Sequence, residues 1–380
     1  MTAKPRATHT SGSPGGRAVR WPAEWERHDA TWIAWPHCAA DWPGKIATIP
    51  WVHAEIARVL AAHERVEILC HSAAIHAAAH RTLAAHSVTR NVRLHRCPTD
   101  RAWLRDSAPT GVLTRDGSLE WVHWGFDGWA KYPNHRRDAK VGAFVARTSR
   151  VPCTEPLRPD TGARAVLEGG GIETDGRGTL LVTEEWLLSR VQVRNPGLSR
   201  GGYESLFARE LGIRNTIWLG EGCVGDDTHG HVDDIARFVA PGVVVLAHEA
   251  DSGDANHRPS VDNLKRLRSA RDARGRALTI VPLPFPRAVM MDGVRLPASY
   301  ANFYIANGVV IVPTFNDPAD REALDTLARV MPRHEVVGIH SLDLVWGRGT
   351  LHCLTQQQPV ALRPRRGTAR RGVTPIDGAQ

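Results

Sequence analysis

Hydrophobic residues recur along the chain in two alternating patterns, a helical spacing and short continuous apolar runs. Residues 51–64 place their apolar side chains on one face of a helix, and the apolar run 65–70 that follows predicts a short strand. An alanine-rich stretch at 72–86 predicts a second helix, and 91–96 predicts a second strand. Residues 51–96 therefore contain a strand–helix–strand unit.

The same alternation continues in the second half of the chain. Helices are predicted at 203–211, 260–273 and 318–330, and strands at 215–219, 234–240, 243–248, 277–283, 303–306, 309–313 and 335–340. Asn307-Gly308 between two of these strands is a strong hairpin signal, and Asp317-Pro318 is typical of a helix start. Because no linker interrupts the pattern, we expect one mixed α/β domain over residues 21–360.

The composition is that of a large globular protein. The chain has 380 residues, of which 42% are hydrophobic and 23% are charged, so it has enough apolar surface for a sizeable core. No apolar run approaches the roughly 20 residues that a membrane-spanning helix needs. The N-terminal residues 1–20 also lack the apolar segment of a secretory signal. We therefore expect a cytoplasmic protein without a membrane partner.

The formal net charge of +8 lies almost entirely in the two ends of the chain. Residues 1–20 contain four basic residues and no acid, and residues 362–380 contain five arginines and one aspartate, so the body sums to about zero. A nucleic-acid enzyme usually carries its basic surface on the folded domain. We therefore expect residues 1–20 and 361–380 to be disordered, solubilising tails and no nucleic-acid partner. The alternative is a protein that binds polyanions through these tails.

The six cysteines are scattered without Cys-x-x-Cys spacing, so we expect free thiols, most of them buried and inert. Cys353 differs because it follows the glycine-rich turn 347–349, which allows a ligand to approach closely. A thiolate nucleophile there needs a cationic or hydrogen-bonding partner to lower its pKa. The neighbouring His352 points away if this segment is a strand, which favours His231 as the base. A buried structural cysteine is the alternative.

Residues 225–234 contain two histidines and several aspartates between glycines. If this segment is extended, His231 and Asp233 face the same side of it. Three interpretations stay open at this point. They are a metal site of His229, His231 and Asp233, acid–base chemistry by His231 with Asp233 binding a cation, and a solvated polar loop.

Several separated carboxylates beside a thiolate suit a planar cation better than an acyl group, because carboxylates repel a carbonyl oxyanion. A guanidinium forms bidentate pairs with carboxylates. Asp106 and Asp233 would hold the guanidinium flat and leave its central carbon open to Cys353. His231 would protonate the departing ammonia and later activate water.

The segments that carry this chemistry are 103–106, 167–171, 225–234 and 347–359. With four further stretches, at 21–26, 31–36, 41–45 and 297–308, they make the sequence resemble the agmatine deiminases of the guanidine-modifying, or pentein, superfamily. These enzymes are related to bacterial-type peptidylarginine deiminases. The resemblance covers about residues 21–360, and it implies a five-bladed α/β propeller with pseudo-fivefold ββαβ-type repeats.

The resemblance also implies a role for each matched residue. Cys353 matches the nucleophile that forms a covalent amidino thioether, and His231 matches the general acid/base. Asp106 and Asp233 match the carboxylates that bind the guanidinium. Glu168 matches the acid that orients the histidine.

Trp103 matches an aromatic residue that lines the substrate channel. No metal or other cofactor is implied, and His229 is left outside the mechanism. The family resemblance further suggests a homo-oligomer.

The sequence departs from the family pattern at a few positions. Ala108 stands where the family has glycine, and Val193 where it has asparagine. Arg348 and Thr350 replace glycine and asparagine before the nucleophile. Because Arg348 is a bulky cation near the expected substrate entrance, these departures bear on the substrate's tail more than on the reaction type.

The expected reaction is hydrolysis of agmatine to N-carbamoylputrescine and ammonia, a step toward putrescine. Within the same reaction class, the alternative substrates are free arginine and peptidyl-arginine. In a different class, the alternative is a metal-dependent hydrolase that uses His229, His231 and Asp233.

Overall fold

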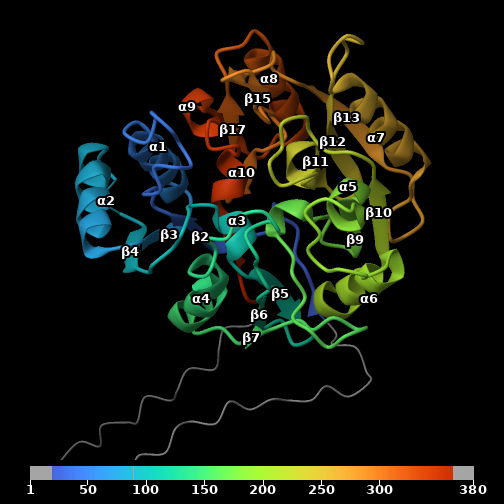
Figure 1. Ribbon diagram of the computed structural model, residues 1–380, viewed down its shortest axis with the longest axis horizontal. Coiled ribbons are helices and arrows are strands. Elements are labelled where there is room, and N and C mark those ends of the chain that lie inside the picture. The colour runs from blue at the N-terminus through green and yellow to red at the C-terminus, as the bar shows by residue number, and fades with distance from the viewer. Residues whose placement is uncertain (1–18, 89, 363–380) are drawn as a thin grey trace, which may run out of the picture.

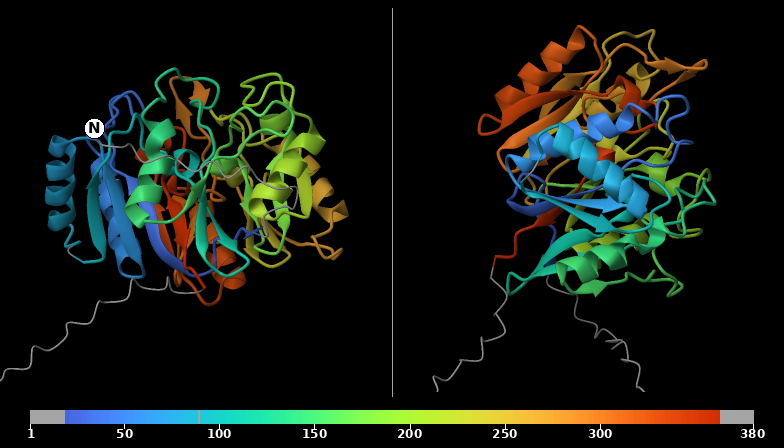
Figure 2. Two further views of the ribbon diagram at one scale, coloured as in Figure 1. Left: turned by 90° about the horizontal axis from the view of Figure 1, so that it is seen from below. Right: turned by 90° about the vertical axis from the view of Figure 1, so that its left-hand side faces the viewer.

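The computed structural model describes residues 19–88 and 90–362, which form α/β structure made of several small sheets. Five sheets of three or four strands lie around a centre that holds the short helices α3 (Leu104–Ser107) and α10 (Leu351–Leu354) (Figure 1). The longer helices lie outside the sheets. Side views show the strands running roughly along the viewing direction of Figure 1 (Figure 2).

Two of the sheets have four strands. In spatial order they are β19 (Gln356–Pro359), β2 (His28–Ala34), β3 (Arg65–Cys70) and β4 (Val92–Arg96), and β1 (Val19–Arg20), β5 (Thr110–Thr114), β6 (Leu119–Val122) and β7 (Cys153–Thr154). The three-stranded sheets are β10 (Asn215–Leu219), β9 (Thr179–Thr183) and β8 (Glu173–Thr174); β11 (Ala236–Ala240), β12 (Val243–His248) and β13 (Thr279–Pro284); and β16 (Tyr304–Ala306), β17 (Val309–Thr314) and β18 (Glu335–His340). A separate hairpin pairs β14 (Met290–Met291) with β15 (Val294–Arg295).

The remaining elements are helices and single 3-10 turns. The helices are α1 (Ile49–Ala61), α2 (Ala73–Ala85), α4 (Val141–Ser149), α5 (Glu184–Leu188), α6 (Arg200–Leu211), α7 (His257–Ser269), α8 (Ala319–Val330) and α9 (Leu342–Val345). The 3-10 turns are η1 (Asp138–Lys140), η2 (Gly169–Gly171) and η3 (Val232–Asp234).

A common unit builds the larger sheets: an antiparallel pair of strands, then helix, then a third strand parallel to the second. β11 and β12 pair antiparallel, and after α7 the chain returns as β13, parallel to β12. The sheets of β5, β8 and β16 follow the same order. In the fifth sheet the C-terminal strand β19 pairs antiparallel with β2, and α1 leads to the parallel strand β3. The end of the chain thus completes the sheet that begins near its start.

Apolar side chains fill the space between the helices and the sheets. In α8, for example, Ala323, Thr326 and Leu327 recur at helical spacing and are buried. The tryptophans Trp32, Trp121 and others are also fully buried, and burying a large apolar side chain contributes about 1.5–3 kcal/mol. This packing holds the loops at the centre of the molecule in place.

The helices and strands predicted in residues 51–96 and 203–340 are confirmed, with ends that shift by a few residues. Two local predictions are wrong. Residues 231–233 are not a strand, because Val232–Asp234 forms the 3-10 turn η3. His352 and Cys353 lie in the helix α10 rather than in a strand. Both segments are too short for their periodicity to identify them, and contacts from other parts of the chain hold their conformations.

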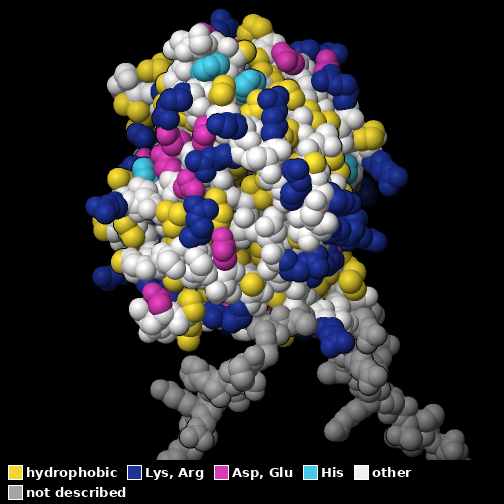
Figure 3. All heavy atoms as spheres, turned by 90° about the vertical axis from the view of Figure 1, so that its right-hand side faces the viewer, with side chains coloured by type: hydrophobic (Ala, Val, Ile, Leu, Met, Phe, Trp, Pro, Cys, Tyr) yellow, Lys and Arg dark blue, Asp and Glu magenta, His cyan; other side chains and the backbone are white. Residues whose placement is uncertain are grey.

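The ends of the described chain and its surface bear on the predictions about tails and charge. Val19 and Arg20, expected in the N-terminal tail, form β1 and pair with β5. Residues 1–18 and 363–380, where the two tails are predicted, lie outside the described residues. On the face that carries α7, basic side chains lie among acidic, histidine and apolar ones (Figure 3). Within residues 19–88 and 90–362, no helix combines the length and the apolar character needed to cross a membrane.

Candidate active site

One cavity near the centre of the fold gathers the residues predicted from the sequence. Its volume is about 170 Å³, and Trp103, Asp106 and Cys353 line it. Asp233 lies 3.7 Å from the sulfur of Cys353, and His231 lies 3.8 Å from Asp106. A larger groove of about 1080 Å³ beside α4 and β19 contains none of these residues, so the smaller cavity is the candidate active site.

Four short segments from distant parts of the chain meet at this cavity. Asp106 lies in α3, Glu168 directly precedes η2, Asp233 lies in η3 and Cys353 lies in α10. α3 contacts both α10 and η2, and η2 contacts η3. The site is therefore made where the inner ends of different sheets converge, which is why no single stretch of sequence contains it.

Asn302 holds the segment that carries the thiol. Its side-chain oxygen accepts hydrogen bonds from the hydroxyl of Thr350, at 2.7 Å, and from the backbone N–H of His352, at 3.1 Å. Its amide nitrogen lies 3.1 Å from the sulfur of Cys353 and donates to Asp234 at 2.9 Å. Asn302 thus fixes both the backbone of α10 and the position of the sulfur.

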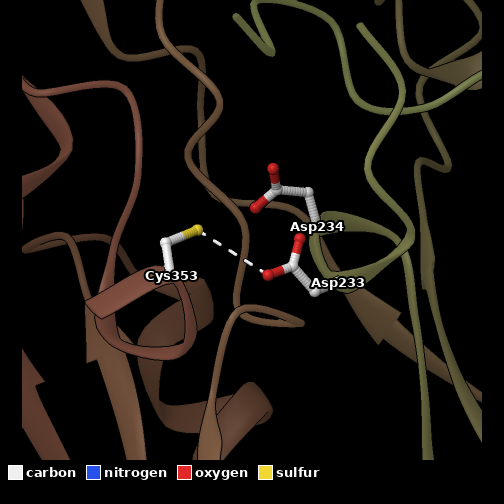
Figure 4. A group of neighbouring side chains, drawn as sticks. All are labelled: Asp233, Asp234 and Cys353. Carbon is white, nitrogen blue, oxygen red and sulfur yellow. Dashed lines mark hydrogen bonds between the residues drawn. The ribbon is translucent and has the colours of Figure 1, made fainter. Parts of the chain in front are cut away.

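The acidic surroundings keep the free thiol protonated. Burial raises the pKa of Cys353 well above its ordinary value, and the nearby carboxylates of Asp233, Asp234 and Asp106 raise it further. Figure 4 shows the sulfur facing the first two of these carboxylates. Among the described residues the lowering influence on this pKa comes from Asn302, which is neutral. Asn302 is therefore a hydrogen-bonding partner of the thiol, of the kind expected from the sequence, but it does not outweigh the burial and the carboxylates.

His231 lies between two carboxylates. One ring nitrogen is 3.8 Å from Asp106 and the other is 3.6 Å from Glu168. Burial disfavours the charged ring, but these carboxylates outweigh it and raise the pKa of His231 to about 9. The backbone N–H of His231 donates to Asp226 at 2.9 Å, which fixes the loop before η3. His231 is therefore a proton donor at neutral pH.

The carboxylate of Glu168 is held on both sides. Its oxygens accept hydrogen bonds from Arg194, at 3.0 Å, and from the indole of Trp186, at 2.7 Å. Burial opposes ionisation, but Arg194 and His231 overcome it and lower the pKa of Glu168 to about 2. A permanently charged Glu168 in a fixed position orients His231 and keeps it protonated.

The two carboxylates expected to bind a guanidinium differ in their surroundings. Asp106 accepts hydrogen bonds from Gly170 and from the indole of Trp129, both at 2.9 Å, and burial raises its pKa to about 6. Asp233 lies 2.7 Å from the Nδ1 atom of His352. Burial raises the pKa of Asp233, but His352 outweighs this and leaves it below its ordinary value.

Several buried polar atoms of the site have no hydrogen-bond partner within the described chain. They are both ring nitrogens of His231 and the Oδ1 atom of Asp233. A buried polar group without a hydrogen bond costs free energy, so a ligand that supplies partners to these atoms would be stabilised there. An acceptor oxygen, a protonated ring and a thiol around one cavity can hold a cation and transfer protons to and from it.

The metal interpretation of residues 225–234 does not fit this geometry. His229 turns away from the cavity, with its Nε2 atom 3.0 Å from Ser189 and its Nδ1 atom 3.7 Å from Glu185. Within the described residues, the group of ligand atoms with metal-like spacing is Asp233, Asp234 and Cys353, and it includes neither histidine. Its closeness is explained by the hydrogen bonds through Asn302.

Sequence reasoning missed several residues that hold the site. They are Glu24, Arg194, Asn302 and the part played by His352. Glu24 and Asn302 stand within the stretches 21–26 and 297–308 that carry the family resemblance, so a signal was present. It did not say which residue of each stretch contacts the site.

Comparisons with known proteins agree in pointing to one family. The family model for Porphyromonas-type peptidyl-arginine deiminases matches residues 20–359. The agmatine deiminase of Pseudomonas fluorescens (strain SBW25) is 35% identical over 93% of this chain and 98% of its own length. That of Stutzerimonas stutzeri (strain A1501) is 36% identical with the same coverage. Among solved structures, the agmatine deiminase of Enterococcus faecalis matches with a TM-score of 0.82 and 29% identity, over 91% of this chain and 98% of that one.

Replacing Gly170 with alanine should disable the site without unfolding the protein. A Cβ atom at this position would lie 2.6 Å from a ring nitrogen of His231 and 3.0 Å from carboxylate oxygens of Asp106 and Asp233. We expect Gly170→Ala to lower turnover of a guanidine substrate about 100-fold, because small displacements of reacting groups are costly. The control is Gly201→Ala, where a Cβ meets nothing within 4 Å. Equal activity of the two variants would contradict the expected steric conflict between a Cβ at position 170 and the residues of the site.

The raised pKa of His231 makes a prediction about stability. Its folded pKa of about 9 exceeds the unfolded value of 6.5, so its ion pairs stabilise the fold fully below pH 6.5 and lose that contribution as the pH rises through 9. Urea unfolding of wild type and His231→Gln should therefore differ by roughly 3 kcal/mol more at low pH than above pH 9, given the size of this shift. A difference that grows with pH would show that the ring is held neutral.

Proposed function

The chain belongs to the family of Porphyromonas-type peptidyl-arginine deiminases, and from this premise we propose that it is an agmatine deiminase, which hydrolyses agmatine to N-carbamoylputrescine and ammonia. The observation that carries the proposal is a buried thiol facing carboxylates, with a protonated histidine beside them. Because the product N-carbamoylputrescine is a step toward putrescine, the reaction belongs to the formation of putrescine.

Binding begins with the positive charge of the guanidinium. The free Oδ1 atom of Asp233 accepts one N–H of the substrate, and Asp106, which lines the cavity, binds the guanidinium as well. Trp103 forms part of the wall. A Cβ on Gly349 would lie 2.9 Å from Trp103 and 3.3 Å from the sulfur of Cys353, so glycine allows the ring to stand beside the nucleophile.

The substrate also activates the nucleophile. Two of the three carboxylates that raise the pKa of Cys353 in the free protein, those of Asp233 and Asp106, are the ones that bind the guanidinium. A bound cation neutralises them and lies next to the sulfur, so the thiol releases its proton to solvent when the substrate arrives and takes a proton back when the product leaves. The thiolate is thus formed where an electrophilic carbon is already in place.

Two steps then complete the reaction. The thiolate attacks the guanidinium carbon and forms a C–S bond, His231 gives a proton to one nitrogen, and the C–N bond breaks to release ammonia. The neutral His231 next takes a proton from water as its oxygen attacks the amidino carbon. The C–S bond breaks, the thiolate is restored, and the ureido product gives one proton to solvent. Glu168 keeps the ring oriented through both steps.

We also propose that residues 21–360 form one catalytic domain with the pentein fold, a five-bladed α/β propeller. The recurring order of two antiparallel strands, helix and parallel strand in five sheets supports this arrangement. A cytoplasmic location stays a prediction from the pattern of apolar residues in the sequence. A homo-oligomeric state and the absence of a cofactor stay predictions from the family resemblance. Free arginine and peptidyl-arginine remain the alternative substrates.

The reaction is tested by assaying ureido product and ammonia from agmatine, free arginine and a blocked arginine peptide. Wild type should act on agmatine, and Cys353→Ser should lose at least about 1,000-fold in turnover, because a hydroxyl is a much weaker nucleophile. Cys153→Ser, which changes an exposed cysteine in β7, is the matched control and should retain activity. Product from arginine but not from agmatine would favour the alternative substrates, and an active Cys353→Ser would exclude the proposed nucleophile.

Asp233→Asn separates the two effects of this carboxylate. Loss of a charge-assisted pair to the guanidinium should lower kcat/KM for agmatine about 100-fold. The same change removes a negative charge beside the sulfur, so the pKa of Cys353, read from the pH dependence of alkylation, should fall. Asp325→Asn, at an exposed position of α8, serves as the control for both readouts. A thiol pKa unchanged by Asp233→Asn would contradict the proposed charge coupling.

A further inference from the structure

A second groove, away from the active site, is lined mainly by arginines. Its volume is about 400 Å³, and four arginines, three glycines and Val19 line it, with no acidic residue among them. The arginines are Arg20, Arg177, Arg214 and Arg274. The groove shares no residue with the cavity that contains Cys353, so the reaction proposed above does not account for it.

This arginine groove lies at the opposite end of β9 from the active site. β9 begins at Thr179, directly after the turn at residues 176–178 that lines the groove, and it ends at Thr183. The hydroxyl of Thr183 donates to the backbone oxygen of Gly230, which directly precedes His231. A ligand in the groove is therefore separated from the substrate by the length of a strand.

The positive charges of the groove are only partly compensated. Arg20 is paired with Glu26, at 2.5 and 2.9 Å. Arg214 donates to the backbone oxygen of Arg177 at 2.8 Å, which gives it no negative partner. The side chains of Arg177 and Arg274 are exposed and have no hydrogen-bond or ion-pair partner among the described residues. Within this part of the chain, three of the four guanidinium groups thus lack a counter-charge.

The acids closest in sequence to these arginines are held by other groups. Asp175 accepts hydrogen bonds from the backbone N–H groups of Arg177 and Thr179, at 2.8 and 2.9 Å. Asp272 accepts one from the backbone of Arg274 at 2.9 Å and is paired with Arg276 at 2.6 Å. Neither carboxylate lines the groove. They stabilise the turns that carry the arginines and leave the guanidinium groups free.

Close packing of these turns keeps the arginines together. A Cβ on Gly178 would lie 2.9 Å from the Nε atom of Arg214, and a Cβ on Gly212 would lie 2.0 Å from the backbone oxygen of Val19. The oxygen of Gly178 also accepts the backbone N–H of Arg214 at 2.8 Å. Like charges held close to one another repel, so the binding of an anion relieves the repulsion.

We propose that this groove binds an anion with two adjacent phosphate groups, held by Arg177, Arg214 and Arg274. Guanidinium groups form bidentate pairs with phosphate oxygens, and one phosphate group carries a charge of about −1.5 to −2 at neutral pH. Three uncompensated guanidinium groups therefore match a diphosphate better than a single phosphate or a carboxylate. The site is independent of the proposed hydrolysis of agmatine.

The test is calorimetric titration of the full chain at low ionic strength with inorganic pyrophosphate, inorganic phosphate and a nucleoside diphosphate. Pyrophosphate should bind at least about tenfold more tightly than phosphate, and its affinity should fall as salt is added, because exposed charges are screened. In Arg177→Gln/Arg274→Gln the affinity for pyrophosphate should fall at least about tenfold, as expected when charge-assisted hydrogen bonds are lost.

The nucleoside diphosphate identifies the source of the anion. Equal affinity for it and for pyrophosphate would support a groove that recognises the diphosphate alone. Tighter binding of the nucleoside diphosphate would support a groove that also contacts the nucleoside.

The matched control is Arg58→Gln/Arg321→Gln, which removes the same charge from exposed positions of α1 and α8 and should bind pyrophosphate as wild type does. Thermal unfolding checks that the groove variant is folded, and the two single variants replace it if it is not. An equal loss of affinity in the two double variants, or no loss in either, would assign the binding to overall charge or to the basic ends of the sequence and overturn the inference. Equal affinity for phosphate and pyrophosphate in wild type, or no binding of pyrophosphate, would overturn it as well. No outcome depends on turnover, so the proposed function is tested separately.

Discussion

One buried carboxylate, that of Glu24, joins the parts of the chain from which the site is built. One of its oxygens accepts hydrogen bonds from Arg237, at 2.7 Å, and from the backbone N–H of Ile305, at 2.8 Å. The other lies 3.1 Å from Arg105 and 2.9 Å from His352. Glu24 precedes β2, and its partners lie in β11, β16, α3 and α10. Removing one member of such a buried ionic group typically costs about 3–5 kcal/mol, so these segments move little relative to one another.

The same network explains how an excess of acids can be kept at the nucleophile. His352 lies between Glu24 and Asp233, so the centre of the fold sets the position of the carboxylate that we propose to bind the guanidinium. Arg194 does the same for Glu168 from the other side. Carboxylates held in this way cannot move apart to relieve their repulsion. The fixed carboxylates therefore favour the binding of a cation. Together with burial, the same negative charges raise the pKa of Cys353 and keep its thiol protonated.

Long amphipathic stretches could be predicted from the sequence, and the centre of the fold could not. The pattern of residues 51–96 predicted two helices and two strands because an element that is buried on one face has apolar residues at regular spacing. η3 and α10 have no such spacing, since each is a single short turn whose conformation depends on a side chain outside it. Asp226 accepts a hydrogen bond from the backbone of His231, and Asn302, which is 50 residues away in sequence, accepts one from the backbone of His352. The resemblance to a known family brought Glu168 and Cys353 together, and the structure places Cys353 in the cavity wall and Glu168 3.6 Å from His231. It could not show which residues hold them there.

The number of acidic side chains near the entrance of the cavity does not indicate how many of them can bind the substrate. Asp227 is a carboxylate of the outer cavity, but its charge is neutralised by ion pairs with Lys131 and Arg348. Arg348 has a φ of 68°, a conformation that favours glycine, and it stands where the family more often has glycine. The ion pair between Arg348 and Asp227 offsets the cost of this backbone conformation, and it makes Asp227 less available to the substrate.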